Sequence, residues 1–152
     1  MIVPVRGGED VETARTLFLE YAQGLGVDLS FQGFDQELKD LPGAYAPPRG
    51  ALLLAVEDGA TLGCVAVRAW DDETAEMKRL YLRPAARGRG LGVVLAKAAV
   101  EEARRIGYRR LRLDTLPGME AAQAIYQEMG FREIPPYRTN PVPGARYLEL
   151  KL

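Results

Sequence analysis

Three alternating glycines beside two arginines form the segment most suited to chemistry in this chain, Arg87-Gly88-Arg89-Gly90-Leu91-Gly92. A run typical of a strand precedes it and stops at Arg83-Pro84, and apolar residues at helical spacing follow it. Main-chain N–H groups at a helix start lack partners within the helix, and the helix dipole adds partial positive charge there. With two guanidinium groups beside them, these N–H groups predict a site for a phosphate or diphosphate.

The spacing of the glycines separates this segment from two common phosphate loops. A Walker A loop ends in Gly-Lys-Ser or Gly-Lys-Thr, whereas this chain has Gly92-Val93-Val94. A dinucleotide fingerprint orders its glycines as G-x-G-x-x-G, whereas Gly88, Gly90 and Gly92 are each two positions apart. A turn that only caps a helix is the simpler alternative, but capping would not require three glycines flanked by arginines.

Composition narrows the class of protein. The 152 residues predict one domain, residues 1–152, and the apolar share of 47% and charged share of 27% are ordinary for a globular chain. Lys and Arg total 20 against 21 for Asp and Glu, so the balance opposes nucleic acid as a partner. No basic start with a long apolar core and no run of membrane-spanning length is present, so we expect a cytoplasmic protein without a membrane partner.

The chain has no histidine and a single cysteine, Cys64. This removes the commonest metal ligand, the Ser-His-Asp triad and the Cys-His pair together, so we expect no metal site and no covalent intermediate. Cys64 lies in an apolar strand-like run, where a small buried hydrophobic residue is the simplest interpretation.

Hydrophobic periodicity predicts an α/β fold with a mixed sheet, in the order β-α-(α)-β-β-β-α-β-α-β-β. The near-continuous apolar run 51–57 indicates a strand covered on both faces. We expect strands at 2–5, 51–57, 61–70, 75–82, 110–114, 131–134 and 147–152, and helices at 11–25, 35–41, 91–106 and 119–129.

Two motifs carry a resemblance to the GNAT family of N-acetyltransferases. Arg87, Gly90 and Gly92 match the Arg-x-x-Gly-x-Gly coenzyme A loop of that family, after the fourth strand. The segment 122–126, Ala-Gln-Ala-Ile-Tyr, followed by Gly-Phe at 130–131, is similar to the family's Ala-x-x-Leu-Tyr…Gly-Phe. The likeness covers about residues 76–133, and residues 1–75 match by element order only. Many members carry Asn at the position of Met119, so that one coenzyme contact is in doubt.

The resemblance implies acetyl-CoA as cosubstrate and assigns residues to it. In the family the fourth and fifth strands separate and pantetheine lies between them like an added strand. By that likeness the Leu80 N–H would face the thioester carbonyl as an oxyanion donor, and Leu82 would hold pantetheine. The residues that would bind the diphosphate are Arg87, Gly88, Arg89, Gly90 and Gly92.

The resemblance also suggests two catalytic residues, each with a simpler alternative. Tyr126 would lie near the coenzyme sulfur and protonate the leaving thiolate, or it is a core tyrosine at helical spacing. Glu76 opens the fourth strand and would be the base for the attacking amine, or it is a surface carboxylate paired with Lys78. Asp114 and Thr115 end the fifth strand near the same cleft, where a polar strand end is the simplest account.

The acceptor side is the least specified part of the sequence. We expect Lys78, Arg79 and Arg83 to be solvated strand charges. Two irregular segments should border the acceptor cleft, although core packing explains their aromatic residues equally well. Their candidate residues are Phe31, Phe34, Asp35, Tyr45, Tyr137 and Asn140.

Together these features predict transfer of acetyl from acetyl-CoA to a primary amine of a small molecule or peptide, by direct attack. A homodimer is plausible. A non-catalytic coenzyme A-binding regulatory module is one alternative. A dinucleotide-binding oxidoreductase is another; Asp114 at a strand end favours it and the glycine spacing opposes it.

Overall fold

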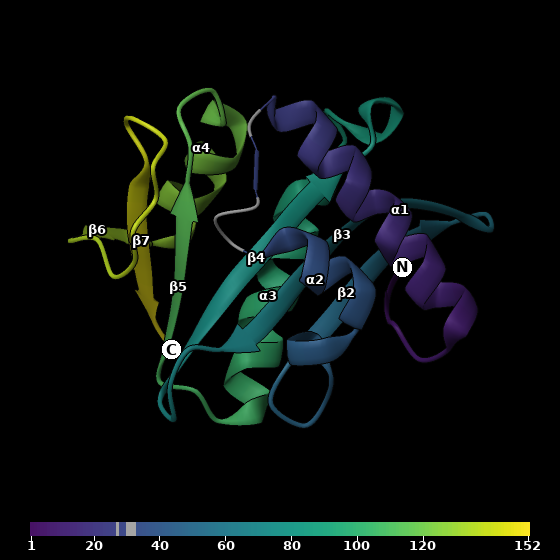
Figure 1. Ribbon diagram of the computed structural model, residues 1–152, viewed down its shortest axis with the longest axis horizontal. Coiled ribbons are helices and arrows are strands. Elements are labelled where there is room, and N and C mark those ends of the chain that lie inside the picture. Colours follow the sequence, from purple (N-terminus) through teal and green to yellow (C-terminus); the bar gives the residue numbers. More distant parts are fainter. Residues whose placement is uncertain (27, 30–32) are drawn as a thin grey trace.

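The computed structural model describes residues 1–26, 28–29 and 33–152, and in these ranges it forms one mixed sheet flanked by helices (Figure 1). The strands are β1 (Ile2–Pro4), β2 (Ala51–Glu57), β3 (Ala60–Ala69), β4 (Thr74–Leu82), β5 (Arg110–Thr115), β6 (Arg132–Ile134) and β7 (Arg146–Lys151). The helices are α1 (Gly8–Leu25), α2 (Phe34–Asp40), α3 (Leu91–Ile106) and α4 (Glu120–Met129), with 3-10 turns η2 (Gly43–Tyr45) and η3 (Pro84–Ala86).

The predicted order of strands and helices is confirmed, and the boundaries differ by a few residues. Helix α1 begins at Gly8, three positions before the expected start, and Glu9 and Asp10 in its first turn complement the helix dipole. It ends at the left-handed Gly26, as the sequence predicts. Helix α4 begins at Glu120, with Met119 as its N-cap.

The sheet runs in the order β1-β2-β3-β4-β5-β7-β6 over the described residues. Strands β1 to β4 pair antiparallel, β4 and β5 pair parallel, and β7 lies antiparallel between β5 and β6. The parallel pair is therefore the junction of two antiparallel halves. Helix α3 makes the crossover that a parallel connection requires.

Two hydrophobic clusters cover the two faces of the sheet, because successive strand residues point to opposite sides. On one face α3 and α4 pack on Leu53, Val65 and Leu113. On the other, α1 and α2 pack on Leu52 and Cys64. Figure 1 shows α1 and α2 in front of the sheet and α3 behind it. Strand β2 is thus buried on both faces, as its apolar run predicts.

Candidate active site

Strands β4 and β5 separate at their carboxyl ends and form a fork. Among the described residues they pair from Thr74 opposite Arg110 to Glu76 opposite Arg112. Beyond that point β4 continues to Leu82 and β5 to Thr115, and the two strands no longer pair with each other. Figure 1 shows the two strands diverging toward the end of the sheet where α4 begins. A ligand that supplies its own amide groups can pair with strand edges exposed in this way.

A bulge in β4 lies at the mouth of the fork. The register between β3 and β4 shifts so that Cys64 faces Tyr81 while Ala66 faces Lys78. Arg79 takes up the extra length with a φ of 60°, in the left-handed region that non-glycine residues rarely adopt. The buried Cys64 thiol donates a hydrogen bond to the Arg79 carbonyl oxygen, with Sγ and O 3.3 Å apart. That carbonyl shares its peptide group with the Leu80 N–H, so Cys64 helps to orient this peptide.

A groove leads from the fork to the start of α3. Its walls come from α1 on one side and from the start of α4 on the other, with the end of β4 as its floor. Its lining includes both leucines that the resemblance assigned to pantetheine, and much of it is apolar. The lining residues are Tyr21, Gly24, Leu25, Leu80, Tyr81, Leu82, Arg87, Gly92, Gly118, Met119, Ala121, Ala122 and Ile125.

The glycine loop, residues 87–92, closes the far end of the groove. Gly90 is the N-cap of α3 with a φ of 78°, which only glycine adopts at little cost. Gly92 lies in the first turn of α3 for a different reason, since a Cβ there would approach Ile125 Cδ1 to 3.1 Å. The spacing therefore serves both a left-handed turn and a close approach between α3 and α4. It leaves the N–H groups of the first turn of α3 beside the groove.

The two arginines of the glycine loop point in different directions. Arg87 lines the groove, and its Nε donates to the Leu82 carbonyl oxygen at 3.1 Å. Arg89 instead forms an ion pair with Glu57 at 2.6 Å, with both side chains about half exposed (46% and 47%). Only Arg87 among the predicted arginines therefore contacts the groove in this structure.

A cavity of about 30 Å³ continues from the groove into the fork. The two spaces share wall residues, among them Leu80 and Met119. Tyr126 lines the cavity from α4 and is 5% exposed. Burial raises the pKa of the Tyr126 hydroxyl, so this group stays protonated at neutral pH. The structure thus places Tyr126 where a proton donor to a group in the fork would lie.

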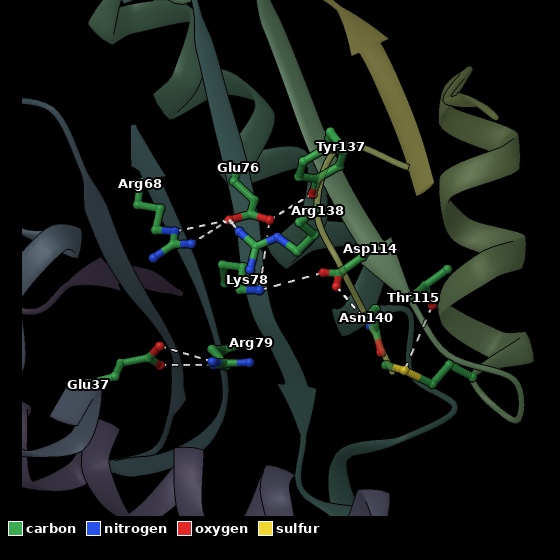
Figure 2. A network of polar contacts seen from close by, with 11 residues as sticks. Glu37, Arg68, Glu76, Lys78, Arg79, Asp114, Thr115, Tyr137, Arg138 and Asn140 are labelled. Atoms are coloured by element: carbon green, nitrogen blue, oxygen red, sulfur yellow. Dashed lines mark hydrogen bonds and ion pairs between the residues drawn. The ribbon is translucent and has the colours of Figure 1, made fainter. Parts of the chain in front are cut away.

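Glu76 lies in a buried network of charges, shown in Figure 2, and is 0% exposed. Its Oε1 accepts hydrogen bonds from Arg68 Nε at 3.0 Å and from an Arg138 amino group at 2.6 Å. Its Oε2 accepts from the Tyr137 hydroxyl at 2.7 Å. Lys78 Nζ lies 3.8 Å from the same oxygen. The alternative of a surface carboxylate paired with Lys78 therefore names the right neighbour, but it is wrong about the surface, because both side chains are buried.

Lys78 and Asp114 connect this network to the cavity, and both line the cavity wall. Lys78 Nζ lies 3.5 Å from Asp114 Oδ1, and Asn140 Nδ2 donates to Asp114 Oδ2 at 3.1 Å (Figure 2). Burial is the main cause that lowers the pKa of Lys78 to about 8, against the attraction of Glu76 and Asp114.

The prediction that the strand charges of β4 are solvated is wrong for Lys78 and Arg79, which are 5% and 3% exposed. Arg79 makes a bidentate pair with Glu37 of α2, with both hydrogen bonds at 2.9 Å. The pattern of charges along one strand could not reveal Glu37 and Asp114 as partners, because both come from distant segments. Arg83 is nearer to the expectation, partly exposed and paired with Glu20.

The segment between β6 and β7 supplies Tyr137, Arg138 and Asn140 to the fork. Asn140 lines the cavity, as expected of a residue that borders the acceptor cleft. Arg138 was not among the predicted site residues; its place in a proline-rich segment is the only signal that the sequence offers for it.

The other acceptor-side candidates have different surroundings. Phe34 and Tyr45 pack in the core cluster under α1 and α2, which supports the core-packing alternative for them. Asp35 is exposed. Phe31 lies outside the described residues. Thr115 ends β5 as a buried residue, and its hydroxyl lies 3.8 Å from the sulfur of Met119.

Clusters of metal ligands and membrane-spanning helices are both absent from the described residues. They hold no group of three or more His, Cys, Asp and Glu side chains placed to bind a metal ion. In the same ranges no helix combines the length and the apolar character needed to cross a bilayer.

Comparison with known proteins gives the family. The sequence model of the Acetyltransferase (GNAT) family matches residues 14–131. An uncharacterized N-acetyltransferase of Schizosaccharomyces pombe is 39% identical over 99% of this chain and 94% of its own length. The N-acetylaspartate synthetase of Homo sapiens is 32% identical over 64% of this chain and 33% of its own length. The chain therefore belongs to the GNAT family of acetyltransferases.

Solved structures agree on the fold. An acetyltransferase from Streptococcus agalactiae has a TM-score of 0.81 at 21% identity, covering 100% of this chain and 98% of its own. A GNAT family acetyltransferase from Elizabethkingia anophelis, solved with acetyl-CoA bound, has a TM-score of 0.69 at 24% identity, covering 100% and 97%. The mixed sheet with its forked strands is thus the GNAT fold.

Proposed function

We propose that this protein transfers the acetyl group of acetyl-CoA to a primary amine of a small molecule or peptide, and that it acts in the cytoplasm. One observation carries the proposal. A continuous path runs from the start of α3, along the apolar groove, into the cavity at the fork where Tyr126 lies. Its chemistry matches a long ligand with a charged diphosphate at one end and a reactive thioester at the other.

The groove offers acetyl-CoA the contacts it needs. The N–H groups of the glycine loop, at Gly88, Gly90 and Gly92, and the Arg87 guanidinium would hold the diphosphate. Arg89 would join them by leaving Glu57, and exposed ion pairs of this kind are weak enough to exchange. The backbone of Leu80 and Leu82 would pair with the amides of pantetheine.

The reaction follows from what surrounds the fork. The amine nitrogen attacks the acetyl carbon, the carbon–sulfur bond breaks, the nitrogen loses a proton and the sulfur gains one. The Leu80 N–H would donate to the carbonyl oxygen as negative charge develops on it. The Tyr126 hydroxyl would supply the proton to the departing thiolate.

Glu76 stays a prediction as the base. Its carboxylate already accepts hydrogen bonds from Arg68, Arg138 and Tyr137, so its lone pairs are largely occupied. Among the described residues that line the cavity, Asp114 supplies the carboxylate. These contacts favour a role for Glu76 in holding the site together and make Asp114 the nearer group to an incoming ammonium.

The test is acetyl-CoA binding by calorimetry, followed by thiol release with a panel of amines. Tyr126→Phe should lower kcat about 100-fold while the Kd for acetyl-CoA changes little. Tyr108→Phe is the matched control, because Tyr108 is equally buried and its hydroxyl bonds to the Arg49 carbonyl, away from the fork. Equal turnover of the Tyr126 and Tyr108 variants would remove the proposed proton donor.

Two outcomes would overturn the function itself. Tight acetyl-CoA binding with no thiol release from any amine would favour the alternative of a non-catalytic coenzyme A-binding module. Absence of binding by well-folded protein would contradict the assignment of the groove.

A further inference from the structure

The charges at the fork form one buried group, which we call the charge cluster. Its members come from five segments: α2, β3, β4, β5 and the segment between β6 and β7. Among the described residues, its cations outnumber its carboxylates by one. The cations are Arg68, Lys78, Arg79 and Arg138, and the carboxylates are Glu37, Glu76 and Asp114.

The ion pairs within the charge cluster show how its cations are shared among its carboxylates. Arg79 and Glu37 neutralise each other through two hydrogen bonds. Glu76 is shared by Arg68 and Arg138, with Lys78 next to it. Asp114 also lies near Lys78 and accepts a hydrogen bond from the Asn140 amide. The formal charge of the charge cluster is therefore net positive over the described residues, and Lys78 is one of its cations that line the cavity.

A second observation points to the same place. The Nε of Arg138 is buried and has no hydrogen-bond partner among the described residues. The Arg138 side chain is 14% exposed and lies over the Trp70 ring at 5.1 Å, which fixes it near Glu76. A net positive charge is unfavourable in a low-dielectric interior, so an anion that enters the cavity beside Lys78 would be attracted by the charge cluster.

We propose that the acceptor amine carries a carboxylate, as an amino acid does, and that this carboxylate binds at Lys78. The inference rests on the proposed acetyl transfer. Lys78 and Asp114 present opposite charges 3.5 Å apart on the cavity wall, which matches an ammonium and a carboxylate a few bonds apart. The carboxylate faces Lys78, within the positive field of Arg138, and the ammonium faces Asp114, which Asn140 holds in place.

The size of the cavity limits the size of the acceptor. Its volume of about 30 Å³ admits little more than one or two small groups without movement of its walls. Tyr126 and Met119 close it on the α4 side, and the segment carrying Asn140 closes it on the other. A short amino acid suits this space better than an acceptor whose carboxylate lies far from its amine.

The experiment compares acceptors that differ only in the carboxylate. Thiol release is measured with acetyl-CoA and matched pairs: glycine against methylamine, β-alanine against ethylamine, and aspartate against its diamide. The kcat/KM for the carboxylate member of each pair should be about 10- to 100-fold higher, the range for a hydrogen bond to a charged group. Equal values in every pair would overturn the inference while leaving the proposed acetyl transfer standing.

Two variants test whether Lys78 causes the preference for acceptors that carry a carboxylate. Lys78→Met removes the charge at similar length and should abolish the preference while the Kd for acetyl-CoA stays unchanged. Lys78→Arg keeps the charge and should retain much of the preference. Lys97→Met, on the exposed face of α3, is the matched control and should behave as the wild type. A preference that survives Lys78→Met in folded protein would contradict the assignment.

A binding measurement separates this inference from catalysis. Succinate, which has carboxylates and no amine, should bind the coenzyme A complex in calorimetry and lose affinity in Lys78→Met. Absence of thiol release with every amine would overturn both the proposed function and the acceptor class. Succinate that binds wild type and Lys78→Met equally would overturn the carboxylate site alone.

Discussion

The glycine loop and the charge cluster lie at opposite ends of one path and are built in opposite ways. The glycine loop is a continuous segment, and its proposed contacts are mostly main-chain N–H groups and one arginine in the groove. The charge cluster is made of side chains from segments as far apart as Glu76 and Arg138, 62 positions away. A backbone site depends on local conformation, which a few residues specify, whereas a side-chain site depends on how distant segments pack.

This difference has a consequence for specificity. Main-chain N–H groups are present in every chain that adopts the same local conformation, so we expect the glycine loop to bind the cosubstrate proposed above, which members of the family would share. Side chains such as Lys78 and Arg138 can vary without changing the fold, so the charge cluster is where one member of the family would select its acceptor.

The largest expected effect concerns the stability of the charge cluster. Glu76→Gln leaves the partly buried Arg68 and Arg138 without their shared, fully buried carboxylate, and we expect the free energy of unfolding to fall by about 3 kcal/mol. Chemical denaturation measures it. Glu133→Gln is the control, since Glu133 pairs with Arg146 at the surface. An unchanged unfolding midpoint with lost activity at every pH would instead support Glu76 as the base.

A substitution in the glycine loop should weaken the binding of acetyl-CoA. Gly90→Val places a β-branched residue at a φ of 78°, and we expect the Kd for acetyl-CoA to rise about tenfold because the start of α3 is distorted. Gly107→Val is the matched control, since Gly107 has a φ of 111° at the far end of the same helix. It should lose stability and keep the Kd. Equal binding losses in both variants would show that general destabilisation, not the loop, is responsible.

The pH dependence of anion binding should separate the two regions. Burial lowers the pKa of Lys78 to about 8, so its charge is present below that pH and is lost as the pH rises through it. Glu76, Asp114, Arg79 and Arg138 are the charged groups that face this amine.

Inhibition by succinate should therefore weaken by up to about tenfold for each pH unit above 8, until the contribution of the charge is exhausted. The Kd for acetyl-CoA should stay level over the same range. Lys78→Arg should give a flat profile, since a guanidinium does not titrate there. A pH profile that is the same in Lys78→Arg and in the wild type would assign the titration to another group.

The smallest expected effect lies where the two regions meet. Cys64→Ala removes the donor to the Arg79 carbonyl, and we expect kcat to fall about threefold as the Leu80 peptide loses its fixed orientation, with the acetyl-CoA Kd unchanged. Burial raises the pKa of the Cys64 thiol, so the thiol keeps its hydrogen. Cys64→Ser retains a donor and should restore kcat. Equal loss in both variants would indicate packing alone.

Much of the fold could be predicted from the sequence because its signals are local. Alternation marked the strands, apolar spacing marked the helices, and left-handed glycines at 26, 107 and 130 end α1, α3 and α4. The candidate site was predicted in part. The groove and the place of Tyr126 follow from two motifs, whereas Arg138 and the burial of Lys78 and Arg79 depend on partners that no local pattern reveals.

By itself the sequence determined the order of the elements and the absence of histidine chemistry, and it predicted a phosphate site at residues 87–92, because each depends on residue type and near neighbours. Only the tertiary structure decided that Arg89 pairs with Glu57, that β4 bulges at Arg79, and that a surplus cation lies at the fork. The physical reason is that ion pairing and burial are set by distance in space. Packing of the sheet, α2 and the segment after β6 brings these charges within a few ångströms.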